Sequence, residues 1–181
     1  LEPTAPAAMT SAQTGALNTS QAAAIETTDI SALSSTNVRA LSTAAVNALT
    51  TDQIAALTTA QTSVLTTAQA AALNTAQVAA LESTDLAAMN SAQIAALNTS
   101  QAAAIETTDI SALNTTNIRA LTTAQFAALN SDQVAALTTT QVAAIEVADM
   151  KAMTPTALAN LSSDQIRAMT SDHVAALTTA Q

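Results

Sequence analysis

The amino-acid sequence predicts an all-α solenoid, a superhelix of very short helices with one helix in each eight-residue repeat. Three observations support this fold class. A large aliphatic residue recurs every eight positions without a slip, polar residues typical of helix N-termini follow it, and alanine precedes the next repeat. Internal repetition at a fixed period is the sequence signature of stacked repeat architectures.

We call each repeat an octad and number its positions from the aliphatic residue. Position one runs from Leu1 in steps of eight to Leu177 and is always Leu, Ile or Met, while position eight is alanine except at Val64 and Asn160. On one long helix, eight residues at about 100° each would shift the aliphatic stripe by about 80° per octad. No single helix could keep that stripe buried, so the chain must turn once in each octad.

Position two is the expected helix N-cap, because it is Thr, Ser, Asn or sometimes Glu, as at Asn18 and Thr50. Position five is mostly Gln, Asp or Asn, which completes a capping box with position two. Positions one and six, both usually large, are then the two partners of a hydrophobic staple. One local motif therefore accounts for the polar residues and for the aliphatic residues of the octad.

Two independent features agree with this register. Pro3 and Pro155 fall at position three, the first helical residue, where the missing N–H has no intrahelical partner to lose. The acids occupy positions two, four and five, and all four bases occupy position seven, which suits the helix dipole. The bases are Arg39, Arg119, Lys151 and Arg167.

Helices of five or six residues are only about 8 to 9 Å long and do not form alone, so stability must come from stacking. Stacked octads would bury position one as a continuous column, with the alanines of position eight allowing close approach. Residues 17–33 are identical to residues 97–113, an offset of ten octads. If this longer repeat is in phase with the coil, two or five octads per turn fit and three do not, although duplication without structural phase explains it as well.

The alternative fold is a β-solenoid. The abundance of Thr, Val and Ile favours it, but the Ala, Gln and Leu content and the capping pattern oppose it. In either fold, residues 1–181 are expected to form a single repeat array cut from a longer protein, because the register is unbroken and the chain stops within an octad. The proline-rich octad 1–8 is interpreted as a frayed end, a capping unit or vector-derived sequence, and residues 147–160 as divergent repeats.

Composition limits the partners. The net charge is −9 with only four basic residues, which disfavours nucleic acid and anionic membranes as partners. Residues 53–81 carry no charge, but Thr, Gln and Asn recur in every octad, so no membrane insertion is expected. The chain has no cysteine, which excludes disulfides and thiolate metal sites.

The sequence predicts no catalytic, cofactor-binding or metal site. The single histidine, His173, occupies position five and is interpreted as a capping residue on the surface, because no cysteine or second histidine could complete a catalytic pair with it. Acidic pairs at positions two and five could be calcium ligands, but capping explains them without a ligand. These pairs are Glu26 with Asp29, Glu82 with Asp85, Glu106 with Asp109, and Glu146 with Asp149.

Two further features concern the expected surface. Arg39 and Arg119 each follow the Asp of a pair by ten residues, which suggests exposed ion pairs between adjacent octads worth well under about 1 kcal/mol. The Thr, Ser and Asn residues of positions two and three could also line one face that binds ice, a mineral or a glycan. Capping already uses the position-two hydroxyls, so a purely structural role is the favoured interpretation.

The units ALTTAQFA, ALNTAQVA and ALNSDQVA resemble the tandem Ala/Thr octads of very long bacterial surface or secreted proteins, which are described as adhesin-like or haem-utilisation proteins. The resemblance covers nearly the whole chain and implies an extracellular, non-enzymatic repeat region. The haem description finds no support in the residues, because His173 and five methionines are the only candidate axial ligands. The chain also resembles the helical repeats of DNA-reading effector proteins, but its octads are far shorter and its charge is acidic.

The sequence thus predicts a spacer, stalk or protein-interaction scaffold in a large bacterial surface protein, with no cofactor and no enzymatic activity. Its expected partners are neighbouring repeats of the same chain and, beyond them, other proteins or glycans. The alternative function is a binding module that uses a regular Thr, Asn and Ser face to recognise a glycan, ice or another ordered surface.

Overall fold

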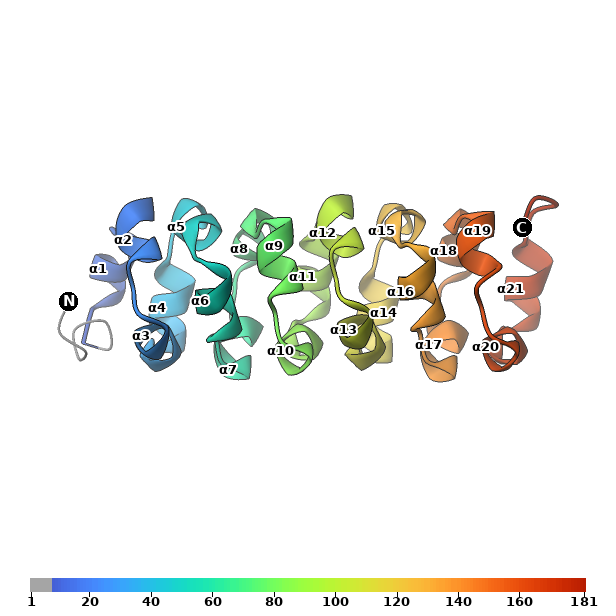
Figure 1. Ribbon diagram of the computed structural model, residues 1–181, viewed down its shortest axis with the longest axis horizontal. Coiled ribbons are helices and arrows are strands. Elements are labelled where there is room, and N and C mark those ends of the chain that lie inside the picture. The colour runs from blue at the N-terminus through green and yellow to red at the C-terminus, as the bar shows by residue number, and fades with distance from the viewer. Residues whose placement is uncertain (1–7) are drawn as a thin grey trace.

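The computed structural model describes residues 8–181 as an elongated rod whose two ends lie far apart (Figure 1). The described residues contain 21 helices of four to six residues each and no strand, which confirms the all-α solenoid and leaves the β-solenoid without support. No helix among them is long and apolar enough to span a bilayer. The interpretations of the first octad concern residues that lie outside the described part of the chain.

Each helix begins at position three of an octad and ends near position seven or eight, as the capping pattern predicts. The bounds are α1 (Ser11–Gly15), α2 (Thr19–Ala23), α3 (Thr27–Ala32), α4 (Ser35–Ala40), α5 (Thr43–Ala48), α6 (Thr51–Ala55), α7 (Thr59–Ser63), α8 (Thr67–Ala72), α9 (Thr75–Ala79), α10 (Ser83–Ala88), α11 (Ser91–Ala96), α12 (Thr99–Ala103), α13 (Thr107–Ala112), α14 (Thr115–Ala120), α15 (Thr123–Ala128), α16 (Ser131–Ala135), α17 (Thr139–Ala144), α18 (Val147–Ala152), α19 (Pro155–Leu158), α20 (Ser163–Ala168) and α21 (Ser171–Ala176).

The N-caps explain where the helices start. Thr122 has an extended backbone and its hydroxyl accepts a hydrogen bond from the N–H of Gln125, while the Gln125 side chain accepts one from the N–H of Thr122. This is the predicted capping box. In every described helix whose N-cap is Ser, Thr or Asn, the side chain accepts the N–H of position five. The hydrogen bond satisfies one of the N–H groups that a helix start leaves without an intrahelical partner.

Three octads make one turn of the coil. Each helix packs against the third helix along the chain, as α2 does against α5, α10 against α13, and α15 against α18. The expectation that two or five octads form a turn is therefore wrong. It assumed that the ten-octad offset between residues 17–33 and 97–113 is in phase with the coil, and ten octads are not a whole number of three-octad turns.

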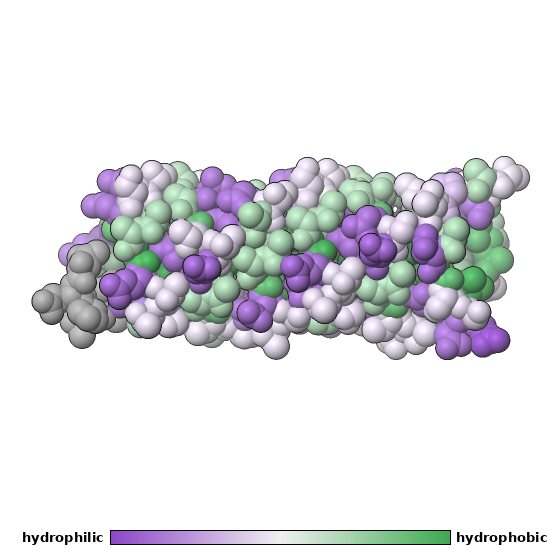
Figure 2. Space-filling view, in the orientation of Figure 1, coloured by the Kyte–Doolittle hydropathy of each residue, from purple (hydrophilic) through white to green (hydrophobic). Residues whose placement is uncertain are grey.

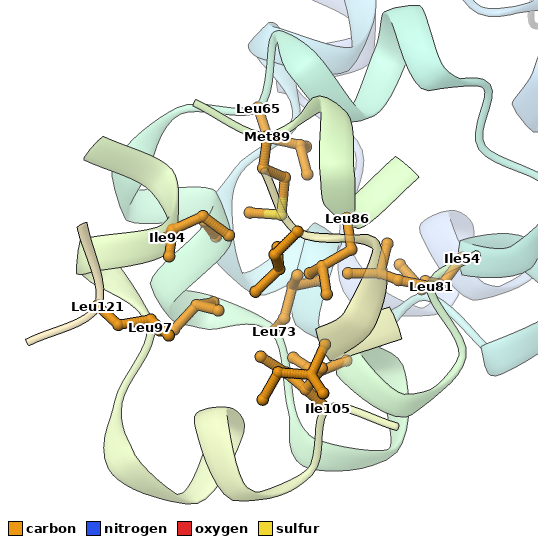
Figure 3. Close-up of a cluster of buried hydrophobic side chains, with 14 of the residues drawn as sticks. Ile54, Leu65, Leu73, Leu81, Leu86, Met89, Ile94, Leu97, Ile105 and Leu121 are labelled. Atoms are coloured by element: carbon orange, nitrogen blue, oxygen red, sulfur yellow. The ribbon is translucent and has the colours of Figure 1, made fainter. Parts of the chain in front are cut away.

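The core is a column of side chains from positions one and six. Figure 3 shows Leu86, Ile94 and Leu97 pointing into one interior with the position-one residues of neighbouring octads. Side chains at position six are the most deeply buried, as Ile94 shows with 0% of its surface exposed. Thr62 interrupts the aliphatic pattern at position six, but its buried hydroxyl donates to the carbonyl of Thr58 one turn earlier. That local hydrogen bond lets a polar residue occupy the core without an unpaired group.

Candidate functional site

Position five holds the side chains that join the turns of the rod. Gln101 is the third residue of α12 and is 1% exposed, and its Oε1 accepts the backbone N–H of Asn98 at 2.6 Å. Its Nε2 donates to the carbonyl oxygen of Ala70 at 3.0 Å and to that of Leu73 at 2.6 Å. Ala70 lies in α8, four helices earlier, and Leu73 follows that helix directly. One amide therefore caps the start of its own helix with its oxygen and the end of α8 with its nitrogen.

This bond recurs along the rod, with each buried glutamine donating to the carbonyl 28 residues earlier at 2.6 to 2.8 Å. A helix end leaves its last carbonyls without intrahelical donors, and these amides supply the donors. Asn37, Asn117 and Gln181 place their nitrogen at the equivalent carbonyl. We call the buried set the glutamine ladder: Gln53, Gln61, Gln69, Gln77, Gln93, Gln101, Gln125, Gln133, Gln141 and Gln165.

His173 occupies the same place as a ladder glutamine and is not on the surface. It is 2% exposed, and its Nδ1 accepts the N–H of Thr170 while its Nε2 lies 2.8 Å from the carbonyl oxygen of Ile145. These two contacts fit the tautomer that carries its hydrogen on Nε2. The expected capping role is present, but the expected exposure is wrong because position five lies beneath the preceding turn.

The acidic pairs do not form capping boxes, which corrects the interpretation from sequence. None of Glu26, Glu82, Glu106 and Glu146 makes a side-chain cap hydrogen bond, although each is the N-cap residue of its helix. A reciprocal box would bring two carboxylates together at one helix start, and their repulsion opposes that arrangement.

The Asp of each pair is buried, and Asp85, Asp109 and Asp149 turn toward the preceding turn of the coil instead. Asp85 is 3% exposed and accepts a hydrogen bond from the Thr59 hydroxyl, which lies 26 residues earlier, at 2.8 Å. Ser83 and Asp109 form the same contact, as do Thr123 and Asp149. The hydroxyl comes from position three of the octad three repeats earlier. At position five, glutamine joins two turns by a hydrogen bond from its amide to the main chain. Aspartate joins them by a hydrogen bond between two side chains instead.

Burial raises the pKa of Asp85 above 3.8, and the nearby Glu82 carboxylate raises it further, while the hydrogen bond from Thr59 partly opposes both. Burial likewise raises the pKa of Asp149, with Thr123 opposing the shift and Glu146 adding to it. Both aspartates are therefore held in places that disfavour their charged form. We therefore expect each aspartate to stabilise the rod less near neutral pH than an amide at the same position would.

The ion pairs expected for Arg39 and Arg119 are not formed among the described residues. Asp109 is buried against the preceding turn, whereas Arg119 reaches the following turn, where its Nε donates to the carbonyl of Ala144 at 3.4 Å. The two side chains therefore extend in opposite directions along the rod. The one ion pair within residues 8–181 joins Arg167 to Asp164 at 3.0 Å, and both side chains are 78% exposed.

An open hollow of about 330 Å³ lies between α6, α9, α10 and α13. Its polar lining includes the carboxylates of Asp52, Glu82, Glu106 and Asp109. The hollow thus presents negative charge to solvent and suits positively charged side chains of a partner. Within the described part of the chain, no three His, Asp or Glu side chains come together in a way that could hold a metal ion.

The glutamine ladder is the feature that reasoning from the sequence missed. Capping alone accounts for Gln at position five, but it would equally allow Glu, whose charge suits a helix N-terminus better. Position five is never Glu, whereas all five glutamates lie at position two. Of Gln and Glu, only the amide offers an acceptor for the capping box together with donors for a second partner. The absence of Glu at position five was therefore the signal in the sequence for a second hydrogen-bond partner of the position-five side chain.

Comparison with protein families identifies the tandem repeat. A family model described as the ALTTAQ repeat matches residues 22–59, 78–104, 102–139 and 142–179, more than half of the chain. This chain belongs to the ALTTAQ repeat family. The six letters run from position eight to position five of the next octad, as at residues 120–125, so the final Gln of the ALTTAQ repeat is the ladder residue. Searches among curated proteins and solved structures gave no match to the chain.

Proposed function

We propose that this ALTTAQ array is a non-enzymatic spacer, stalk or protein-interaction scaffold within a large bacterial surface protein. The observation that carries the proposal is the glutamine ladder, which joins successive turns into one straight rod with its ends far apart (Figure 1). The ladder acceptors are main-chain carbonyls, present in every octad. Length can therefore grow octad by octad without a new interface, which is the property a spacer requires.

The surface of the rod also suits a spacer. On the face shown in Figure 2, strongly hydrophilic residues form separate patches among small and weakly polar residues. The net charge of −9 makes neighbouring rods repel one another, which opposes non-specific association. Display outside a bacterial cell is supported by the resemblance of the octads to those of long surface proteins. The protein partners of such a scaffold would dock on the rod from its side.

Stretching single molecules between handles fused to both ends tests the spacer role. We expect the rod to keep its folded length at low force and then to lengthen in successive steps, because each turn contacts only its neighbours. A Gln101→Glu variant should begin to lengthen at lower force than a Gln21→Glu variant, which changes the same residue type outside the ladder. One large cooperative rupture of the whole rod, or extension from the lowest force, contradicts the proposal.

Surface display requires a separate test. Antibodies raised against the purified rod should label intact cells of the organism that encodes it, without permeabilisation. Labelling that appears only after the cells are opened would remove the surface location and leave the mechanical role as it stands.

A second candidate function is recognition of a regular surface by rows of hydroxyl groups. The stacked helices α6, α9 and α12 place the exposed position-three residues Thr51, Thr75 and Thr99 in one row along the rod. Ice or a repeating glycan would match such a row. Thermal hysteresis and glycan-array binding test this function, and a Thr75→Val variant should lower either signal. Absence of both signals in the unmodified rod excludes it.

A further inference from the structure

Four asparagines of the chain are followed two residues later by Ser or Thr, with a residue other than proline between them. They are Asn18, Asn98, Asn114 and Asn160. This spacing is the acceptor motif for sugars linked to the asparagine side chain, which are found on exposed parts of proteins. A chain rich in Asn, Thr and Ser contains such triplets by composition alone. The surroundings of each asparagine in the folded rod therefore decide which of them could carry a sugar.

Asn98 presents its whole motif to solvent in the middle of the rod. It directly precedes α12, which packs against α9 on one side and α15 on the other. Its Oδ1 accepts the N–H of Gln101 at 2.9 Å, whereas its Nδ2 donates to no described residue. Asn98, Thr99 and Ser100 are all exposed. The nitrogen that would carry a sugar is thus accessible and has no hydrogen bond within the fold to lose.

Two of the other motifs are less open. The Nδ2 of Asn160 donates to the carbonyl of Thr156 at 2.8 Å, and Leu161, the middle residue of its motif, is 8% exposed. The Nδ2 of Asn114 lies 3.4 Å from the carbonyl oxygen of Ala87. In both cases the fold already supplies an acceptor for the amide nitrogen. This difference sets Asn98 apart from them, although the local letters are equally suitable.

We propose that Asn98 is a site of N-glycosylation, at which a transferase attaches a sugar to the folded rod. The donor is a glycosyl diphosphate. The Nδ2 of Asn98 forms a bond to C1 of the sugar, while the bond between C1 and the phosphate oxygen breaks and the diphosphate leaves. One proton passes from the amide nitrogen to solvent. The product is still an amide, with its oxygen and one N–H in place.

The rod can accept this modification without a change in its packing. The Oδ1 of the modified Asn98 still accepts the N–H of Gln101, so the N-cap of α12 is kept. Gln101 is 1% exposed, and its bonds to Ala70 and Leu73 do not involve the Nδ2 of Asn98. The sugar would extend from the side of the rod and add a bulky, solubilising group there. This inference goes beyond the spacer role and does not depend on it.

Mass spectrometry of the array purified from the organism that encodes it tests the site. Cleavage after Glu82 and Glu106 gives a peptide of residues 83–106, which contains both Asn90 and Asn98. Asn90 is a natural control, because its Oδ1 makes the same cap but Ala92 stands where the motif requires a hydroxyl. We expect a sugar on Asn98 and none on Asn90. A single sugar unit would identify a nucleotide-linked donor, and a preassembled chain of sugars a lipid-linked donor.

Two variants examine the motif itself. Ser100→Ala keeps Asn98 and its cap but removes the hydroxyl, so it should abolish the sugar on Asn98. Ala92→Ser completes the motif at Asn90 and should add a sugar there. Both changed positions are exposed, and circular dichroism will verify that both rods remain helical.

Several results would overturn the proposal. One is an unmodified peptide of residues 83–106 from the native rod. Another is a sugar carried by the hydroxyl of Thr99 or Ser100 instead of the Asn98 amide, or a Ser100→Ala rod that keeps the sugar. Equal modification of Asn160 would also overturn it, because the folded rod would then play no part in selecting the site.

Discussion

The glutamine ladder makes a sharp prediction, because the chain contains the same octad inside and outside it. Gln101→Glu and Gln21→Glu change the same residue within the identical sequence NTSQAAAI. Both variants keep an oxygen that accepts the N–H of the N-cap residue. Only Gln101 also donates to the carbonyls of Ala70 and Leu73 from a buried position. The comparison therefore isolates the donor bonds from capping and from helix propensity.

The expected magnitudes follow from these contacts. Each lost amide bond contributes about 0.5 to 1.5 kcal/mol, and the buried carbonyls left without donors add a desolvation penalty. A carboxylate facing them disfavours the fold further. Gln101→Glu should lower the free energy of unfolding by about 2 to 4 kcal/mol at about pH 7. Gln21→Glu should change it by less than about 0.5 kcal/mol, because an exposed carboxylate in a first helical turn suits the helix dipole.

Urea unfolding followed by far-ultraviolet circular dichroism measures both variants, and hydrogen exchange locates the loss along the rod. Burial raises the pKa of the carboxyl that Gln101→Glu introduces, so this variant is most stable below the ordinary pKa of a carboxyl and loses stability as the pH rises through the raised value. The deficit should therefore shrink at about pH 3, where the protonated carboxyl can donate one bond. Equal loss in both variants, or no loss in either, would refute the role given to the ladder.

Three further predictions concern single positions. Asp85→Gln should stabilise the rod by about 1 to 2 kcal/mol at about pH 7 by restoring a ladder amide. Because the folded pKa of Asp85 is raised above 3.8, the aspartate is least unfavourable below that pH. The stabilisation measured by urea unfolding should therefore fall as the pH drops toward about 3, and a gain that does not depend on pH would contradict this reasoning. Phe126→Ala removes a side chain that is 1% exposed and should lower the free energy of unfolding by about 3 to 5 kcal/mol. Phe126→Ile introduces the residue that other octads carry at position six and should lower it by less than about 1.5 kcal/mol in the same assay. His173→Gln keeps an acceptor for Thr170 and a donor for Ile145, so its urea midpoint should stay within about 0.5 kcal/mol of the unmodified rod, and a larger loss would show that the imidazole packs in a way the amide cannot.

Apart from the capping boxes expected for the acidic pairs, the sequence alone predicted the features that depend on contacts within one octad. The caps at Asn18 and Thr50, the helix lengths and the buried positions one and six follow from spacings of three to five residues. The number of octads per turn was not predictable in the same way. It depends on contacts over 28 to 31 residues, and the main-chain acceptors of those contacts leave no mark on the sequence.

The same limit explains the errors at charged positions. The local sequence predicts His173 on the surface, because polar side chains favour exposure, and it predicts Asp85 in a capping box with Glu82. The structure buries both beneath the preceding turn, where Ile145 and Thr59 supply their partners. The ion pairs expected for Arg39 and Arg119 are absent among the described residues for a related reason. The path of the coil decides whether a side chain points toward the preceding or the following turn, and the local sequence does not show this.

The backbone acceptors of the ladder also have a consequence for inheritance. Nearly identical octads are prone to unequal crossing-over, which deletes or duplicates whole repeats in frame. A ladder glutamine needs only a carbonyl 28 residues earlier, and any octad provides one. The aspartates need a hydroxyl 26 residues earlier, and most octads carry Thr or Ser at position three. Recombinant genes of many lengths should therefore encode rods that fold, so the reach of this protein should be able to change by whole octads.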